Sequence, residues 1–237
     1  MIGDYADSFD ASEYVSSGGT SGGLNVYTGV GNDTIIVNPT GDVSLNGLFS
    51  ADGEDGNDLF KVGIAEGSGP DYMMNYTGVA LSGGKGSDTY QLRAEGYGVT
   101  ITEDGVSSDK IEFYGVAADF NLNDLQFTLE QYGGDYGDGS YGDGSYGGGS
   151  SDSIPYYTLK ICGIDGKTSS EGSSVLTFSG NAQGDSLMLY QGEVGSNTLM
   201  ANIDLNSVVT ALQNTGNSTY WQTLTFNKGS GNKYTAS

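Results

Sequence analysis

The stretch GGKGSDTYQ, residues 83–91, joins a glycine-rich turn to a short run of strand-forming residues. Asp88 closes the turn, and Tyr90 follows it two positions later. The phrase recurs with the same phase in three further places, which are TGVGNDTII at 28–36, GEDGNDLFK at 53–61 and DGVSSDKIE at 104–112. Such self-similarity predicts stacked copies of one structural unit, because a single copy buries too little apolar surface to be stable alone.

Each copy places an apolar side chain on the same face of its strand. Successive strand residues point to opposite faces, so the second residue after each aspartate faces the same side in every copy. These residues are Ile35, Phe60, Tyr90 and Ile111. A second strand in each unit is expected at Val43-Ser44-Leu45, Val79-Ala80-Leu81 and Val99-Thr100-Ile101. The alternation of Leu24 and Val26 indicates a degenerate half-unit before the first copy.

The turns combine two features of a cation site. Glycines permit positive φ angles that turn carbonyl oxygens toward a common point, and the aspartate adds an anionic oxygen. Calcium takes about six to eight such ligands, so two stacked turns would complete one site. The expected carboxylate ligands are Asp33, Asp58, Asp88 and Asp109, the expected carbonyl donors are Gly29, Gly31, Gly53, Gly56, Gly84 and Gly86, and Asp55 and Asn57 are second choices. In the alternative interpretation, each aspartate only satisfies amides of its own turn.

The phrase resembles the nonapeptide G-G-x-G-x-D-x-U-x of the RTX (repeats-in-toxin) calcium-binding proteins. Residues 83–91 match it throughout, whereas the other copies carry Thr28, Glu54 or Ser107 in place of a glycine. The resemblance implies a parallel β-roll whose turns bind calcium between neighbouring coils. The anchor aspartates at 33, 58, 88 and 109 are 25, 30 and 21 residues apart rather than one nonapeptide apart, so we expect calcium turns on one edge only.

The expected fold class is all-β, with a parallel β-roll or β-helix solenoid followed by a β-rich capping region with one short helix. Residues 18–115 are assigned to the roll and 116–237 to the C-terminal β domain. Residues 1–17 would act as a private cap or as an arm for assembly. Asp185 lies in a segment, Gly184-Asp185-Ser186-Leu187, that matches the repeated phrase only weakly and lacks its glycine pattern. It is expected to be an ordinary turn residue.

The C-terminal domain contains three recognisable parts. Runs at 123–129 and 157–161 resemble the segment that commonly closes RTX domains. The Tyr-Gly-Asp-Gly-Ser repeats at 132–152 predict a hairpin tip between them, either a solvated loop or a tyrosine-bearing contact arm. A helix is expected at 204–214, with Asp204 as its N-cap. The hydroxyl-rich tail resembles the uncleaved C-terminal signal of type I secretion substrates.

Charge limits the partners that the chain can have. Its 237 residues include 30 Asp and Glu against 8 Lys and Arg, which gives a net charge of −22. Such a surface repels nucleic acid and anionic membranes, so cations are the expected partners. No stretch is apolar enough to insert into a membrane, and no secretory signal peptide is recognised. Type I secretion would then supply the route to an extracellular or cell-surface location.

Residue content also argues against catalysis. The chain has no histidine, so catalytic designs that depend on a histidine base are excluded. Cys162 lies in an apolar, strand-like run and is expected to be structural, since no histidine can activate it. We therefore expect no enzymatic activity. A calcium-assisted polysaccharide lyase is the weakest alternative, because Arg93 is the only arginine that could bind an anionic substrate.

The expected function is structural. The ends of a solenoid expose unpaired strands that must be capped or joined to another subunit. We therefore expect calcium-dependent self-association into a homo-oligomer or filament, within an extracellular layer, fibre or biofilm matrix. The alternative is a calcium-dependent adhesin that stays monomeric and binds a glycan or a cell surface.

Overall fold

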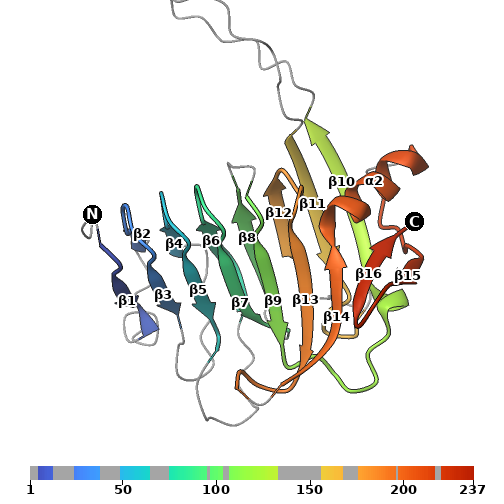
Figure 1. Ribbon diagram of the computed structural model, residues 1–237, viewed down its shortest axis with the longest axis horizontal. Coiled ribbons are helices and arrows are strands. Elements are labelled where there is room, and N and C mark those ends of the chain that lie inside the picture. The colour runs from blue at the N-terminus through green and yellow to red at the C-terminus, as the bar shows by residue number, and fades with distance from the viewer. Residues whose placement is uncertain are drawn as a thin grey trace, which may run out of the picture.

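The computed structural model describes residues 5–12, 24–37, 49–64, 75–94, 97–103, 107–132, 156–167, 176–195, 197–216 and 220–237. These segments form two β-sheets, with a helix near the C-terminal end (Figure 1). In spatial order, the first sheet contains β1 (Ser8–Asp10), β3 (Thr34–Val37), β5 (Leu59–Val62), β7 (Thr89–Arg93), β9 (Lys110–Tyr114), β13 (Ser186–Gln191), β14 (Thr198–Asp204), β16 (Lys233–Ala236) and β15 (Phe226–Lys228). The second contains β10 (Gln126–Tyr132), β11 (Tyr156–Cys162), β12 (Leu176–Gly180), β8 (Tyr97–Thr102), β6 (Asn75–Ser82), β4 (Phe49–Asp52) and β2 (Leu24–Tyr27).

Consecutive strands alternate between the two sheets over the repeated part of the chain. The strands β2, β4, β6 and β8 lie in the second sheet, and β3, β5, β7 and β9 lie in the first. In the first sheet, β3, β5, β7 and β9 pair in parallel, with Phe60 opposite both Ile35 and Tyr90, and with Ile111 opposite Tyr90. These four residues are at most 1% exposed, so the predicted shared apolar face is confirmed.

The same apolar row continues beyond the four repeats. Phe9 of β1 lies opposite Ile35, and Leu187 of β13 lies opposite Ile111. In the second sheet, β12 pairs in parallel with β8. The strands β12 and β13 therefore add one more two-strand unit to the stack. Both sheets combine strands from before and after residue 115, where a domain boundary was expected.

One second-sheet strand was not anticipated. The expected strand at 43–45 lies outside the described residues, and β4 at 49–52 pairs with both β2 and β6. Phe49 and Ala51 of β4 are buried. The alternation in this strand is short and ends in an acidic residue, so the pattern alone did not distinguish it from a loop.

The C-terminal region closes one end of the sheets. The strands β10 and β11 pair antiparallel, as expected for strands that flank the insert at 132–152, most of which lies outside the described residues. The 3-10 turn η1 (Leu122–Asp124) precedes β10, and the helix α2 (Leu205–Thr215) packs against β10 and β16.

The ends of α2 are set by its capping residues. The Asp204 carboxylate accepts hydrogen bonds from the backbone N–H groups of Asn206 and Ser207, and Gly216 ends the helix with a φ of 65°. The buried face consists of Leu205, Val208, Val209, Ala211 and Leu212. The helix predicted at 204–214 is therefore confirmed to within one residue.

The chain is thus mainly β, with largely parallel pairing and a short helix. Within the described segments, no helix has the length and apolar character needed to cross a membrane. Cys162 is the last residue of β11 and is fully buried, which agrees with the expectation of a strand residue with a structural role.

Candidate metal centre

The turns that lead from the second sheet to the first end in aspartates. Asp33, Asp58, Asp88 and Asp109 directly precede β3, β5, β7 and β9, and Asp185 directly precedes β13. All five residues are at most 2% exposed. Because the strands that follow pair in register, the five aspartates stack in one line, which we call the aspartate column.

Hydrogen bonds from backbone to carboxylate hold the column together. The N–H of Asp33 donates to Oδ1 of Asp58, and the N–H of Asp58 donates to Oδ1 of Asp88, both at 2.7 Å. The N–H of Asp88 donates to Asp109, and that of Asp109 to Asp185, both at 2.9 Å. Each carboxylate is therefore fixed by the turn that precedes it in the stack.

The Oδ2 atoms of the column aspartates indicate whether the column fits a metal ion. Oδ2 of Asp33, of Asp58 and of Asp185 is buried and accepts no hydrogen bond. The ion pairs among the described residues do not include these three aspartates. A buried carboxylate oxygen without a donor carries a large desolvation cost. A bound cation would offset that cost, so the donor set of the column fits a hard metal ion.

Glycine allows the turns to approach each other closely. A Cβ atom at Gly56 would lie 1.5 Å from the carbonyl oxygen of Gly31, and one at Gly86 would lie 1.6 Å from that of Gly56. The structure places all six expected carbonyl donors in these turns, namely Gly29, Gly31, Gly53, Gly56, Gly84 and Gly86. The stack therefore depends on residues that lack a side chain.

The substitution Gly56→Ala should destabilise the protein by about 1–3 kcal/mol, because its methyl group overlaps backbone that cannot move without separating two turns. The backbone at Gly56 lies outside the left-handed region, so the effect is steric. Thermal unfolding in excess calcium measures it. Gly229→Ala is the matched control, since a Cβ atom there would meet nothing closer than 3.6 Å. Equal melting temperatures for the two variants would show that the turns are not closely stacked.

The two second-choice ligands lie outside the column. Asp55 is exposed and forms an ion pair with Lys85 at 2.9 Å. Asn57 is exposed, and its side-chain oxygen accepts a hydrogen bond from the N–H of Ser87 at 2.7 Å. Both residues therefore link neighbouring turns on their outer side, and the structure does not bring them together with the four anchor aspartates.

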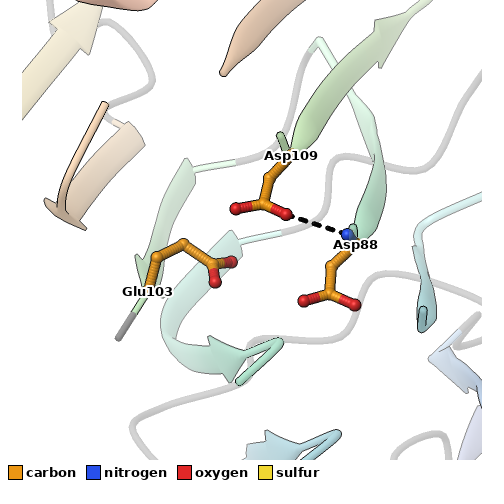
Figure 2. Close-up of side chains that lie close together, drawn as sticks. All are labelled: Asp88, Glu103 and Asp109. Carbon is orange, nitrogen blue, oxygen red and sulfur yellow. Dashed lines mark hydrogen bonds between the residues drawn. The ribbon is translucent and has the colours of Figure 1, made fainter. Parts of the chain in front are cut away.

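A glutamate adds one further carboxylate beside the column. In Figure 2, the side chain of Glu103 extends toward Asp88 and Asp109, and carboxylate oxygens of the three residues lie within 4.8 Å of one another. Glu103 is fully buried, and the hydroxyl of Tyr90 donates a hydrogen bond to its Oε1. This buried acidic cluster could bind a metal ion, because three anionic oxygens converge in it.

Burial raises the pKa values of four of these carboxyl groups, those of Asp58, Glu103, Asp109 and Asp185, since the protein interior disfavours the charged form. It raises the pKa of Asp58 and of Asp185 to about 7, and that of Glu103 to about 9, with neighbouring carboxylates adding to the effect. Burial also raises the pKa of Asp109. Without a cation, Asp58, Asp185 and Glu103 would hold protons near neutral pH, and metal binding would release them.

Sequence reasoning missed two residues of this site. Asp185 was expected to be an ordinary turn residue, and its signal was the strand phase of Gly184-Asp185-Ser186-Leu187, which matches the other copies. Glu103 directly follows β8, as Gly53 follows β4. Its signal was a carboxylate in a place where another copy has glycine. Neither signal stands out without the alignment of the strands in space.

Comparison of the chain with protein-family models, with curated proteins and with solved structures finds no match in any of the three.

Proposed function

We propose that this protein is a non-enzymatic, calcium-binding structural protein that folds with calcium and self-associates outside the cell. The aspartate column carries the proposal, because five buried carboxylates in one stack are costly without a cation. Calcium fits better than a softer metal, since the chain has no histidine and the donors are oxygens. Each ion would lie between successive turns, held by column carboxylates and by carbonyls of the glycine turns.

We interpret the two sheets as a β-roll of the RTX type, with calcium turns on one edge. The alternation of strands between two parallel sheets supports this interpretation. So does the column, which lies where the glycine turns connect the second sheet to the first. Calcium would thereby join each unit to the next. Export by a type I route would place the chain where millimolar calcium is present.

The edges of the two sheets support self-association. Among the described strands, β1 and β2 end the sheets on one side, and β15 and β10 end them on the other. An edge strand presents backbone groups that can pair with a strand of another copy. Residues 8–10 pair with β3 of their own chain, so this part of the N-terminal segment supplies the edge itself. The net charge of −22 would oppose association until cations reduce it.

Static light scattering and electron microscopy of the purified protein test the proposal. We expect monomers in chelator, and filaments or layers in millimolar calcium. The carbonyl oxygen of Asp7 accepts a hydrogen bond from the N–H of Thr34, and the N–H of Ala11 donates one to the carbonyl oxygen of Ile36. Successive residues of a strand direct their backbone groups to opposite sides, so the N–H of Ser8 points toward the open edge. Ser8→Pro should therefore reduce assembly while leaving the calcium-induced strand signal intact, and Ser8→Ala is its control. A calcium-bound protein that stays monomeric at high concentration would contradict self-association and favour a glycan-binding adhesin.

A further inference from the structure

We propose that Glu103 is a metal ligand, and that it makes the cluster of Asp88, Glu103 and Asp109 the cation site of highest charge and affinity within the described part of the chain. The inference rests on the proposed function, because it assigns a distinct property to one level of the aspartate column. The ligand class is a hard cation, and the site should favour a trivalent ion over calcium.

The position of Glu103 in its turn explains why its carboxylate reaches the column. The residue that follows β4 is Gly53, and the residue that follows β8 is Glu103. A Cβ atom at Gly53 would lie 2.1 Å from Oδ2 of Asp58, so a side chain at this place points at the column. Glu103 has such a side chain, and it extends toward Asp88 and Asp109 (Figure 2).

The carboxylate of Asp109 is also arranged differently from its neighbours. Its Oδ1 accepts the N–H of Asp88, and its Oδ2 accepts the hydroxyl of Ser107 at 3.0 Å. In contrast, Oδ2 of Asp58 and of Asp185 accepts no hydrogen bond. Beside Asp109, Glu103 contributes an additional anionic oxygen, which a turn with glycine at this position lacks.

Asp185 supplies an independent indication that this part of the column binds a cation. It is the next residue of the column after Asp109, is 2% exposed, and has a buried Oδ2 without a hydrogen-bond donor. Because the Asp185 carboxylate lies against the backbone of Asp109, a cation bound by Asp109 would help to offset the cost of burying this oxygen.

Charge distinguishes this site from the glycine turns. Two successive glycine turns offer one aspartate each and otherwise neutral carbonyls, whereas this cluster offers three carboxylates. Electrostatic attraction grows with the product of the charges and is strong in a buried site. We therefore expect terbium(III) to bind here before it fills the glycine turns, and to be displaced only by a large excess of calcium.

Terbium titration of the full chain tests the proposal through luminescence. The Tyr90 hydroxyl bonds to Glu103, so the Tyr90 ring is near the cation and should transfer its excitation to bound terbium. In wild type, tyrosine-sensitised emission should saturate near one equivalent. Tyr90→Phe should remove most of this emission, which assigns it to this site.

Two variants of Glu103 complete the test. Glu103→Gln removes the charge and keeps the shape, and Glu103→Gly restores the residue that other turns have in this place. Circular dichroism in calcium checks that they fold. Both should weaken terbium binding at the sensitised site by roughly tenfold or more, since even outer-shell changes at metal sites cost that much. Glu130→Gln, in a half-buried ion pair with Lys160 on the second sheet, is the control and should behave as wild type.

The outcomes separate this inference from the proposed function. Wild-type terbium affinity and emission in both Glu103 variants would overturn the inference and leave calcium binding by the column intact. A wild-type protein whose strand content and calorimetric signal do not respond to calcium would instead overturn the proposed function.

Discussion

A metal-free sample at pH 7.5 should lose most of its strand signal in circular dichroism and regain it in millimolar calcium. The reason is that the column places five carboxylates in a buried stack, where their charges repel each other and lack solvent. A site that binds only the folded state contributes about 2.7 kcal/mol when free calcium is a hundredfold above Kd. A domain typically has about 5–15 kcal/mol of net stability, so two or three such sites decide whether the chain folds.

A pair of variants connects this effect to the column. Asp58→Asn removes a buried charge that lacks a donor at Oδ2, so it should reduce the gain in melting temperature that calcium produces. Asp119→Asn removes an exposed charge outside the column and should leave that gain unchanged. A metal-free protein that is fully folded and melts at the same temperature as the calcium-loaded protein would contradict the prediction.

Acid should replace calcium in stabilising the fold. The folded-state pKa values of Asp58 and Asp185 are about 7, and that of Glu103 is about 9, all above their ordinary values. Between the unfolded and folded pKa values, the folded protein binds more protons than the unfolded chain. The free energy of unfolding must therefore fall as pH rises, by up to about 1.4 kcal/mol per pH unit for each group. In chelator, strand content should return as pH is lowered from about 8 to about 5.

Saturating calcium should reverse the sign of this pH dependence. A bound cation keeps the carboxylates ionised, which lowers their folded pKa values, and protons then compete with the metal as pH falls. Urea unfolding at several pH values, with chelator and with calcium, measures both slopes. Parallel curves under the two conditions would show that the raised pKa values of Asp58, Asp185 and Glu103 are not linked to metal binding.

The repeated phrase was sufficient to predict the four strands that directly follow its turns, β3, β5, β7 and β9, and their shared apolar face. It also predicted which four aspartates stack, because the turn ends at the same place in every copy and the strand period of two fixes the direction of the following side chain. The ends of α2 were predictable for a similar reason. Asp204 and Gly216 act on backbone groups within a few residues of themselves, and such contacts are recorded in the local sequence.

Contacts between distant parts of the chain could not be predicted in this way. The pattern at 49–52 is too short to identify β4, whose place is set by its pairing with β2 and β6. Asp55 and Asn57 resembled ligands by composition, but turn geometry directs them to the outer side. A residue type alone does not specify which side of a turn its side chain occupies.

The sequence by itself determined the repeated unit, the acidic turns and the oxygen-rich donor set, since each depends on the conformation of adjacent residues. Only the tertiary structure brought Asp185 into the column, 76 residues after Asp109, and brought Glu103 against Asp88 and Asp109. The physical reason is that burial and repulsion between carboxylates depend on which strands become neighbours. That choice is made by packing of the two sheets, not by the spacing of residues along the chain.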